Sequence, residues 1–291
     1  MTTFTFDAIG TSWQIDIYKT IPDTEKSELF LAIQKRITEF DKTYSRFRDD
    51  SLVMSIARES GKFIFPEDSK KIFELYYDLY NLTDGFFTPF VGQILSDAGY
   101  DAQYSLKQKR ELQNPPLWES VIDFDYPTLV VKEPVLLDFG AGGKGYLVDI
   151  VAEVIEKYGI FEYVIDAGGD IVHKGSVPIN IGLEHPQNFD QAIGIYNLSN
   201  GSLCSSAGNR RVWGNFTHII NPATLESPKN ILGVWVFAKN ALLADSLATC
   251  LFFVSAHKLL KKYDFEYLVM YDDMHIEKSH NFSAEIFHET K

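Results

Sequence analysis

The chain has 291 residues, and 45% of them are hydrophobic, which is enough to bury a sizeable core and excludes a globally disordered protein. Its 27 Lys and Arg residues are outnumbered by 40 Asp and Glu residues, so the net charge is −13 with neutral histidines. An acidic chain is unsuited to a nucleic-acid backbone or an anionic membrane surface, so we expect neither partner. The longest apolar run, 242–254, is interrupted by Asp245 and is too short to span a bilayer, so no membrane insertion is expected.

The N-terminal half predicts one strand and two helices. Trp13, Ile15 and Ile17 alternate with polar residues, as in a half-buried strand. A helix is expected after Pro22, and a second one from near Pro66 to Asp84-Gly85, because apolar residues recur there every three or four positions. These apolar positions are Leu29, Ile33, Ile37 and Phe40 in the first helix, and Ile72, Leu75, Tyr76 and Leu79 in the second.

The C-terminal half predicts more strands than helices. One helix is expected between a glycine-rich run and Gly159, and another over about Asn240–Val254. The strands are expected at 129–131, 135–137, 163–165, 179–181, 192–197, 201–205, 232–237 and 267–270. Because strands and helices do not alternate strictly, we expect an α+β fold with a mainly antiparallel sheet and packed helices. No break in composition marks a boundary, so residues 1–291 are expected to form one compact domain.

Cellular location is predicted from the cysteines and the N-terminal residues. The two cysteines, Cys204 and Cys250, are too far apart for a zinc or redox motif, and we expect buried thiols in a reducing compartment. Residues 1–7 have neither the basic nor the apolar region of a signal peptide. Together these features predict a cytoplasmic protein.

The glycine-rich run, Asp138–Gly145, is the first candidate for chemistry. Small residues let the backbone approach a ligand, and the helix that follows offers N–H groups to an anion. The run lacks the spacing and the Ser or Thr of a P-loop. Gly140, Gly142 and Gly145 match the dinucleotide fingerprint G-x-G-x-x-G, so an NAD(P)-linked oxidoreductase is one interpretation and a turn needed only for packing is another.

Three further segments combine polar residues with apolar surroundings. The paired glycines of Asp166–Asp170 permit either a hairpin turn or a close approach of the backbone to a ligand. His218 is either a structural or a functional residue. Asp245 and Thr249, at i and i+4 of the last helix, share one face. Their oxygens suit Mg²⁺, and an ordinary amphipathic helix is the alternative.

In this order along the chain, the segments resemble those of the ApbE family, the FAD:protein FMN transferases. The resemblance runs from Gly10 to about Phe253 and is most specific in the glycine-rich run and in the helix with Asp245. The segments that carry it are Gly10–Trp13, Phe47–Ser51, Gly85–Gly92, Asp138–Tyr146, Asp166–Asp170, His218–Thr224 and Ala244–Thr249. This resemblance ranks the flavin hypothesis above the oxidoreductase.

The resemblance implies an ApbE-like, T-fold-like unit that transfers FMN from its substrate FAD to a Thr or Ser hydroxyl of an acceptor flavoprotein, with Mg²⁺ as cofactor and release of AMP. By position, Asp245 and Thr249 would bind the metal through their side chains, and Ala141 through its carbonyl oxygen. The residues that match the family's flavin-nucleotide site are Phe47, Phe86, Phe87, Thr88, Asp138, Lys144, His218 and Ile219.

The expected chemistry is attack on a diphosphate, which needs charge neutralisation and positioning more than covalent catalysis. We expect Asp245 and His218 to be catalytic, His218 as general base with an ordinary pKa of about 6.5. An FAD pyrophosphatase or a flavin-binding protein at the same site is the alternative. The chain departs from the family pattern at Thr88, where Asp is common, at Gly142-Gly143, where larger residues are usual, at Asp166, where Asn is common, and at 222–226, which lacks the family's basic residue and glycine.

Overall fold

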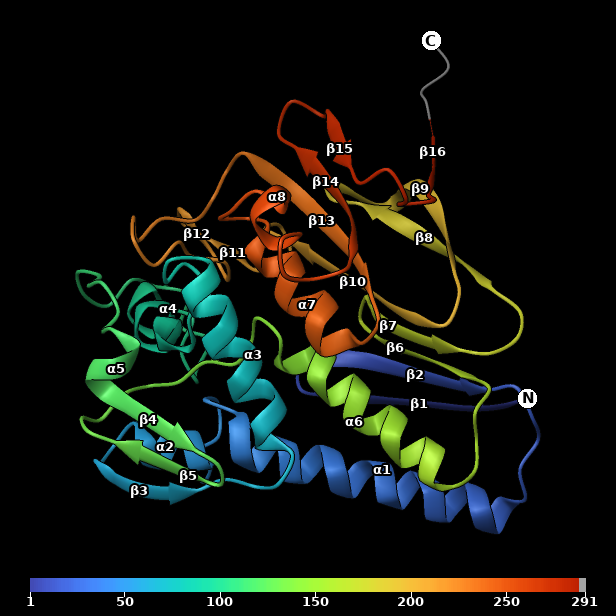
Figure 1. The fold of residues 1–291 in the computed structure, drawn as a ribbon, viewed down its shortest axis with the longest axis horizontal. Coiled ribbons are helices and arrows are strands. Elements are labelled where there is room, and N and C mark those ends of the chain that lie inside the picture. The colour runs from blue at the N-terminus through green and yellow to red at the C-terminus, as the bar shows by residue number, and fades with distance from the viewer. Residues whose placement is uncertain (288–291) are drawn as a thin grey trace.

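The fold is built on an eight-stranded sheet that runs through the middle of the computed structural model, which describes residues 1–287 (Figure 1). All neighbouring strands in it pair antiparallel. In spatial order they are β1 (Thr2–Ala8), β2 (Thr11–Ile17), β6 (Tyr163–Ala167), β7 (Asp170–Lys174), β10 (Gly201–Ala207), β13 (Ile231–Ala238), β14 (Glu266–Tyr271) and β15 (Ile276–Lys278).

Three helices cover one face of this sheet and build the main core with it. α1 (Asp23–Tyr44) contacts α6 (Gly143–Lys157), and α6 contacts α7 (Ala241–Cys250), which lies on β10 and β13 (Figure 1). The apolar positions predicted for α1 are buried, as their spacing requires. Cys204 and Cys250 are buried free thiols, as expected.

A smaller sheet covers the opposite face. It consists of β8 (Ile179–His185), β9 (Asn188–Leu198) and β16 (Glu285–Ile286). Side chains alternate between the two faces of a strand. Val234 and Val236 of β13 therefore join the helices' core, whereas Trp235 packs with Leu183 and Tyr196 of the smaller sheet.

Most of the remaining elements gather at one end of the large sheet (Figure 1). β3 (Gly61–Ile64), β4 (Ile122–Asp125) and β5 (Thr128–Val131) form a three-stranded sheet, and β11 (Val212–Trp213) pairs with β12 (Phe216–Thr217). The remaining helices are α2 (Leu52–Ile56), α3 (Ser69–Leu82), the 3₁₀ turn η1 (Pro89–Val91), α4 (Gly92–Ala98), α5 (Trp118–Val121) and α8 (Ala256–Leu259). Over residues 1–287, no helix has the length and apolarity that a membrane crossing requires.

The predicted α+β class, with a mainly antiparallel sheet and packed helices, is confirmed, but one predicted strand is wrong and one predicted helix is shorter than expected. Residues 135–137 form no strand. They run between other elements, and the Val135 N–H donates to the Ile56 carbonyl (3.3 Å). The helix predicted over about Asn240–Val254 is α7 and ends at Cys250, because the chain tightens into a turn in which the Phe252 N–H donates to the Thr249 carbonyl (3.2 Å).

The dinucleotide-binding interpretation of the glycine-rich run is also wrong. That motif needs a strand directly before the glycines and a parallel sheet around them. Here the run Gly140–Gly145 follows irregular chain, and the sheet beneath α6 is antiparallel. The NAD(P)-linked oxidoreductase therefore has no structural basis.

The glycines instead allow α6 and α7 to approach closely. A Cβ atom on Gly145 would lie 2.2 Å from the Ala241 carbonyl oxygen, and one on Gly142 would lie 2.2 Å from the Ser246 hydroxyl oxygen. Gly143 is different, since its nearest neighbour would be the Phe139 Cβ at 3.5 Å, an ordinary contact. At Gly142 and Gly145 the packing of the helices therefore excludes a side chain.

We expect Gly145→Ala to destabilise the protein by about 1–3 kcal/mol, because the added methyl group must push α6 away from α7. Gly143→Ala is the matched control and should leave the stability unchanged or slightly higher, since Ala favours helix more than Gly. Urea unfolding followed by circular dichroism measures both. Equal midpoints for the two variants would contradict the packing argument.

Candidate active site

A cleft of about 1110 Å³ opens where the N-terminal end of α6 and the middle and C-terminal part of α7 meet the β6–β7 turn. All of the residues predicted for the site line it: Phe47, Phe86, Phe87, Thr88, Asp138, Ala141, Lys144, His218, Ile219, Asp245 and Thr249. Pockets for drug-sized ligands are typically about 300–1,000 Å³, so this cleft has room for a dinucleotide. The sequence motifs, which are spread over most of the chain, thus meet in one place.

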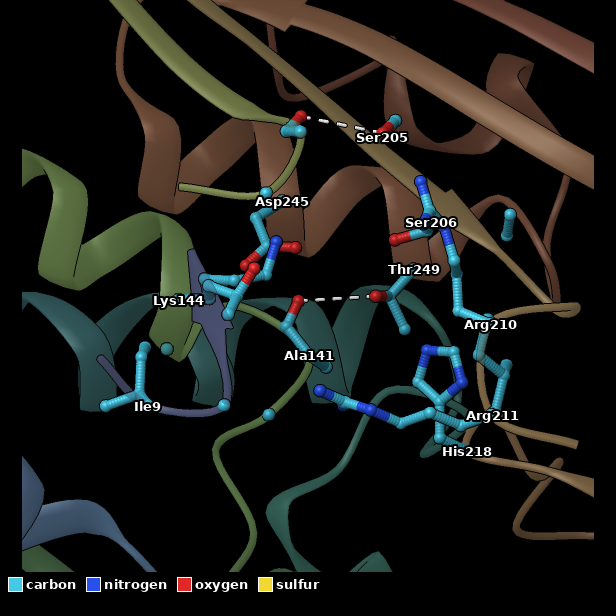
Figure 2. A pocket seen from close by; sticks show the side chains of 18 of the residues that line it. Ile9, Ala141, Lys144, Ser205, Ser206, Arg210, Arg211, His218, Asp245 and Thr249 are labelled. Carbon is cyan, nitrogen blue, oxygen red and sulfur yellow. Dashed lines mark hydrogen bonds between the residues drawn. The ribbon is translucent and has the colours of Figure 1, made fainter. Parts of the chain in front are cut away.

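Three oxygen-bearing residues predicted to bind metal lie together at the start of α6 (Figure 2). The Thr249 hydroxyl donates to the Ala141 carbonyl oxygen (3.3 Å), and Asp245 lies one turn earlier on the same side of α7. Among the described residues, no group of three or more His, Cys, Asp or Glu side chains gathers to hold a metal. One carboxylate with a hydroxyl and a carbonyl oxygen still fits Mg²⁺, which usually keeps waters and binds substrate phosphates.

The charge of Asp245 supports the same fit. It is only 4% exposed, and burial together with the charge of Asp170 raises the pKa of its carboxyl group to about 8. The other buried carboxylates of residues 1–287 each have a Lys or Arg within ion-pair distance, whereas Asp245 has none. A buried carboxylate without a counter-ion is costly, and a bound cation would remove that cost.

Lys144 lies beside this carboxylate, as the second residue of α6. Its ammonium group forms an ion pair with Asp170, which is fully buried at the start of β7. Burial lowers the pKa of Lys144, but the charges of Asp170 and Asp245 outweigh burial, so the net shift is upward. Lys144 is therefore a fixed positive charge in the cleft. The sequence analysis did not predict that Asp170 would pair with Lys144, although it named the segment Asp166–Asp170 that this residue ends.

The two helices that carry these residues cap each other. At the start of α7, the N–H groups of Ala241 and Leu242 donate to the two carboxylate oxygens of Asp149 on α6 (2.9 and 2.8 Å). At the start of α6, the Gly145 N–H donates to Asp245 Oδ2 on α7 (2.9 Å). Each helix thus satisfies N–H groups of the other that have no partner within their own helix. This exchange holds Ala141 close to Thr249.

Aromatic rings form the far end of the cleft. The Phe47 ring stacks on Tyr104 with centroids 5.4 Å apart and meets the edge of Tyr100 at the same distance. The Arg46 guanidinium lies 4.2 Å from the Phe47 centroid and pairs with Asp138. Sequence analysis did not assign a role to Arg46, Tyr100 or Tyr104, because their partners are distant in the chain and no local periodicity includes them.

Phe86, Phe87 and Thr88 form the wall next to α3. The Phe86 ring lies parallel to that of Phe253, with centroids 6.5 Å apart. Phe87 is only 2% exposed and packs on Tyr76, so most of its ring belongs to the core. The Thr88 hydroxyl accepts the Phe90 N–H (3.2 Å) and caps η1, a use of this side chain that requires no ligand.

His218 lies on the opposite side of the cleft, and its protonation differs from the expectation. Burial lowers the pKa of its imidazole to about 4, and the charges of Arg211 and Lys144 act in the same direction. Nδ1 is buried without a hydrogen-bond partner in the described structure. The next residue, Ile219, is held by a hydrogen bond from its N–H to the Thr217 hydroxyl (3.1 Å). At neutral pH the imidazole is therefore uncharged and free to accept a proton.

Comparison with known proteins finds a family whose members are similar to this chain over most of its length. Residues 9–269 match the model of the ApbE family. A curated relative in Escherichia coli, named FAD:protein FMN transferase, is 24% identical over 276 residues, which cover 86% of this chain and 77% of the relative. A relative with the same name in Vibrio cholerae is 23% identical over 83% of this chain and 78% of its own length.

Two solved structures share the fold. The ApbE protein of Thermotoga maritima superposes with a TM-score of 0.80 at 22% identity and covers 97% of both chains. The flavin transferase ApbE of Vibrio cholerae superposes with a TM-score of 0.77 at 20% identity and covers 96% of both chains. The ApbE-like architecture expected from the sequence is confirmed.

The capping role of Asp149 predicts a loss of stability on its removal. We expect Asp149→Ala to destabilise the protein by about 1–2 kcal/mol, because two N–H groups at the start of α7 lose their acceptor. Asp149→Asn keeps one oxygen acceptor and should lose less. Urea unfolding of the three proteins measures the order, and an Ala variant as stable as the wild type would contradict it.

Proposed function

Because this chain belongs to the ApbE family, we propose that it is an FAD:protein FMN transferase, which moves FMN from FAD to a Thr or Ser hydroxyl of an acceptor flavoprotein and releases AMP in the presence of Mg²⁺. The observation that carries the proposal is the meeting of Asp245, Thr249 and Ala141 oxygens beside Lys144 in one large cleft. A single domain over residues 1–291 and a cytoplasmic location remain predictions from the sequence.

In the proposed reaction, the acceptor hydroxyl oxygen forms a bond to the phosphorus of FMN. The bond from that phosphorus to the bridging oxygen of AMP breaks, and the hydroxyl proton leaves to a base. Asp245, Thr249 and Ala141 would hold Mg²⁺, and a bound Mg²⁺ would supply positive charge against the diphosphate and the departing AMP. Lys144 adds a point charge that Asp170 keeps in place.

The chain's other residues bind and orient the reactants in this proposal. The stacked rings of Phe47 and Tyr104 offer a surface for a planar flavin ring. Asp138 fixes Arg46 beneath Phe47 and accepts the Gly140 N–H (2.6 Å), so it supports the site through the residues around it. His218, uncharged at neutral pH and with a free Nδ1, would accept the proton of the acceptor hydroxyl.

A product assay tests the transferase directly. The protein is incubated with FAD and Mg²⁺, with and without a flavoprotein domain that carries an acceptor Thr, and AMP, free FMN and protein-bound flavin are quantified. We expect AMP to appear in step with bound flavin. Chelation by EDTA, or Asp245→Ala, should lower the rate by at least about 100-fold, because charge on the diphosphate is then left unneutralised.

Thr249→Ser is the matched control, since it keeps the hydroxyl and should retain most of the activity. The fate of FMN decides between the proposed activities. AMP that appears together with free FMN would make the protein an FAD pyrophosphatase. Binding of FAD without any AMP, with every acceptor tried, would leave a flavin-binding protein.

The low pKa of His218 predicts the acid side of the pH profile. At saturating Mg²⁺, which would keep Asp245 ionised, only His218 titrates on the acid side. Since its neutral imidazole prevails above a pKa of about 4, kcat/KM should then stay level from pH 9 down to about pH 5 and fall below it. This parameter reports the free enzyme. His218→Ala should lower it by about 10²–10⁴-fold across the range, as expected for loss of a general base. Full activity of His218→Ala over pH 6–9 would remove His218 from this role.

A further inference from the structure

Arg211 differs from the other cations that line the cleft in having no carboxylate within ion-pair distance among residues 1–287. The other cleft-lining cations are all paired with acids: Arg46 with Asp138, Arg48 with Asp50, Lys144 with Asp170, and Arg210 with Glu184. In a chain of net charge −13, one free guanidinium at a large cleft is a distinct feature. Its adjacent residue, Arg210, makes the contrast clear, because its pair with Glu184 measures 2.6 Å.

The position of Arg211 also distinguishes it. The side chain starts from the loop after β10 and passes His218 toward the side of the cleft that holds Ala141 (Figure 2). Its guanidinium carbon lies 5.7 Å from the centroid of Tyr100. Its Nη2 atom would lie 3.8 Å from a Cβ on Gly10, in the turn between β1 and β2. The charge therefore sits between the aromatic end of the cleft and the cluster around Asp245.

We propose that Arg211 binds the diphosphate of the flavin dinucleotide, an inference that rests on the proposed function. A guanidinium presents two parallel N–H groups that match two phosphate oxygens, and it stays charged at every physiological pH. Lys144 is committed to Asp170, so it offers less of its charge to a ligand. An acidic protein that binds a doubly negative ligand needs such a cation to offset its own field.

This role makes Arg211 a residue that discriminates between ligands. FAD carries two phosphates, whereas riboflavin carries the same ring with none. The aromatic end of the cleft would treat the two rings alike, and the guanidinium would favour only the phosphorylated ligand. Removal of Arg211 should therefore weaken the binding of FAD and leave the binding of riboflavin unchanged.

The test measures dissociation constants of FAD and riboflavin by flavin fluorescence, with EDTA present so that no Mg²⁺-dependent turnover removes the ligand. For Arg211→Ala we expect the FAD constant to rise roughly tenfold, as for loss of one charged hydrogen-bonding group near solvent. Arg210→Ala removes the same group from the adjacent, already paired position and should change the dissociation constant of FAD by less than about twofold. Arg211→Lys keeps the charge but loses the two parallel N–H groups of the guanidinium, so its dissociation constant for FAD should lie between those of the wild type and Arg211→Ala.

Salt provides an independent readout of the same charge. The FAD constant of the wild type should rise with salt concentration more steeply than that of Arg211→Ala, because one ion contact is missing in the variant. Equal FAD affinity in Arg211→Ala and Arg210→Ala would overturn the inference while leaving the transferase proposal intact. An equal loss for riboflavin and FAD would overturn it too, since the effect would then come from the aromatic end. A wild type that binds no FAD, with or without Mg²⁺, would overturn both proposals.

Discussion

The close approach of α6 and α7 is the constraint on which the candidate site depends. Packed helices are usually about 8–10 Å apart, and the distance depends on the side chains between them. Here Gly142 and Gly145 leave no side chain at the contact, so the helices come close enough to exchange caps through Asp149 and Asp245. The same approach brings oxygens from two distant segments, at Ala141 and Thr249, to within 3.3 Å. The glycine-rich run therefore serves packing and ligand binding at once, and the two interpretations that its sequence left open are not exclusive.

Local pattern predicted those parts of the fold that local physics decides. The apolar stripe of α1, the alternation along β2 and the shared face of Asp245 and Thr249 follow from helix and strand periodicity. The strand predicted at residues 135–137 is wrong, because an apolar run can also be buried in irregular chain when other elements accept hydrogen bonds from its N–H groups. The order of the motifs along the chain indicated that the site residues belong to one site. Periodicity alone could not have predicted this.

Long-range electrostatics lay beyond any local signal. The imidazole of His218 is shifted by burial and by Arg211 and Lys144, and Lys144 lies more than seventy residues earlier in the chain. Its low pKa changes the reason for choosing it, because an ordinary histidine would be partly protonated near neutral pH, whereas this one is fully neutral there but is also a weaker base. The pair of Arg46 with Asp138 likewise joins residues 92 positions apart. Which charges are neutralised, and which are left over, emerges only when the chain is folded.

The two charged residues of the cleft that have no partner indicate how charge is distributed on the ligand. Within residues 1–287, the cleft holds one buried carboxylate without a cation, Asp245, and one cation without a carboxylate, Arg211, and they do not pair with each other. A protein that needed only stability would gain by pairing or removing Asp245, because an uncompensated buried carboxylate is unfavourable, whereas the exposed Arg211 costs little where it stands. A single ligand with a divalent cation on one side and exposed phosphate oxygens on the other would compensate both at once. A metal-bound diphosphate has this distribution of charge, so the two unpaired residues favour a dinucleotide with a central diphosphate over a ligand that is merely planar and aromatic.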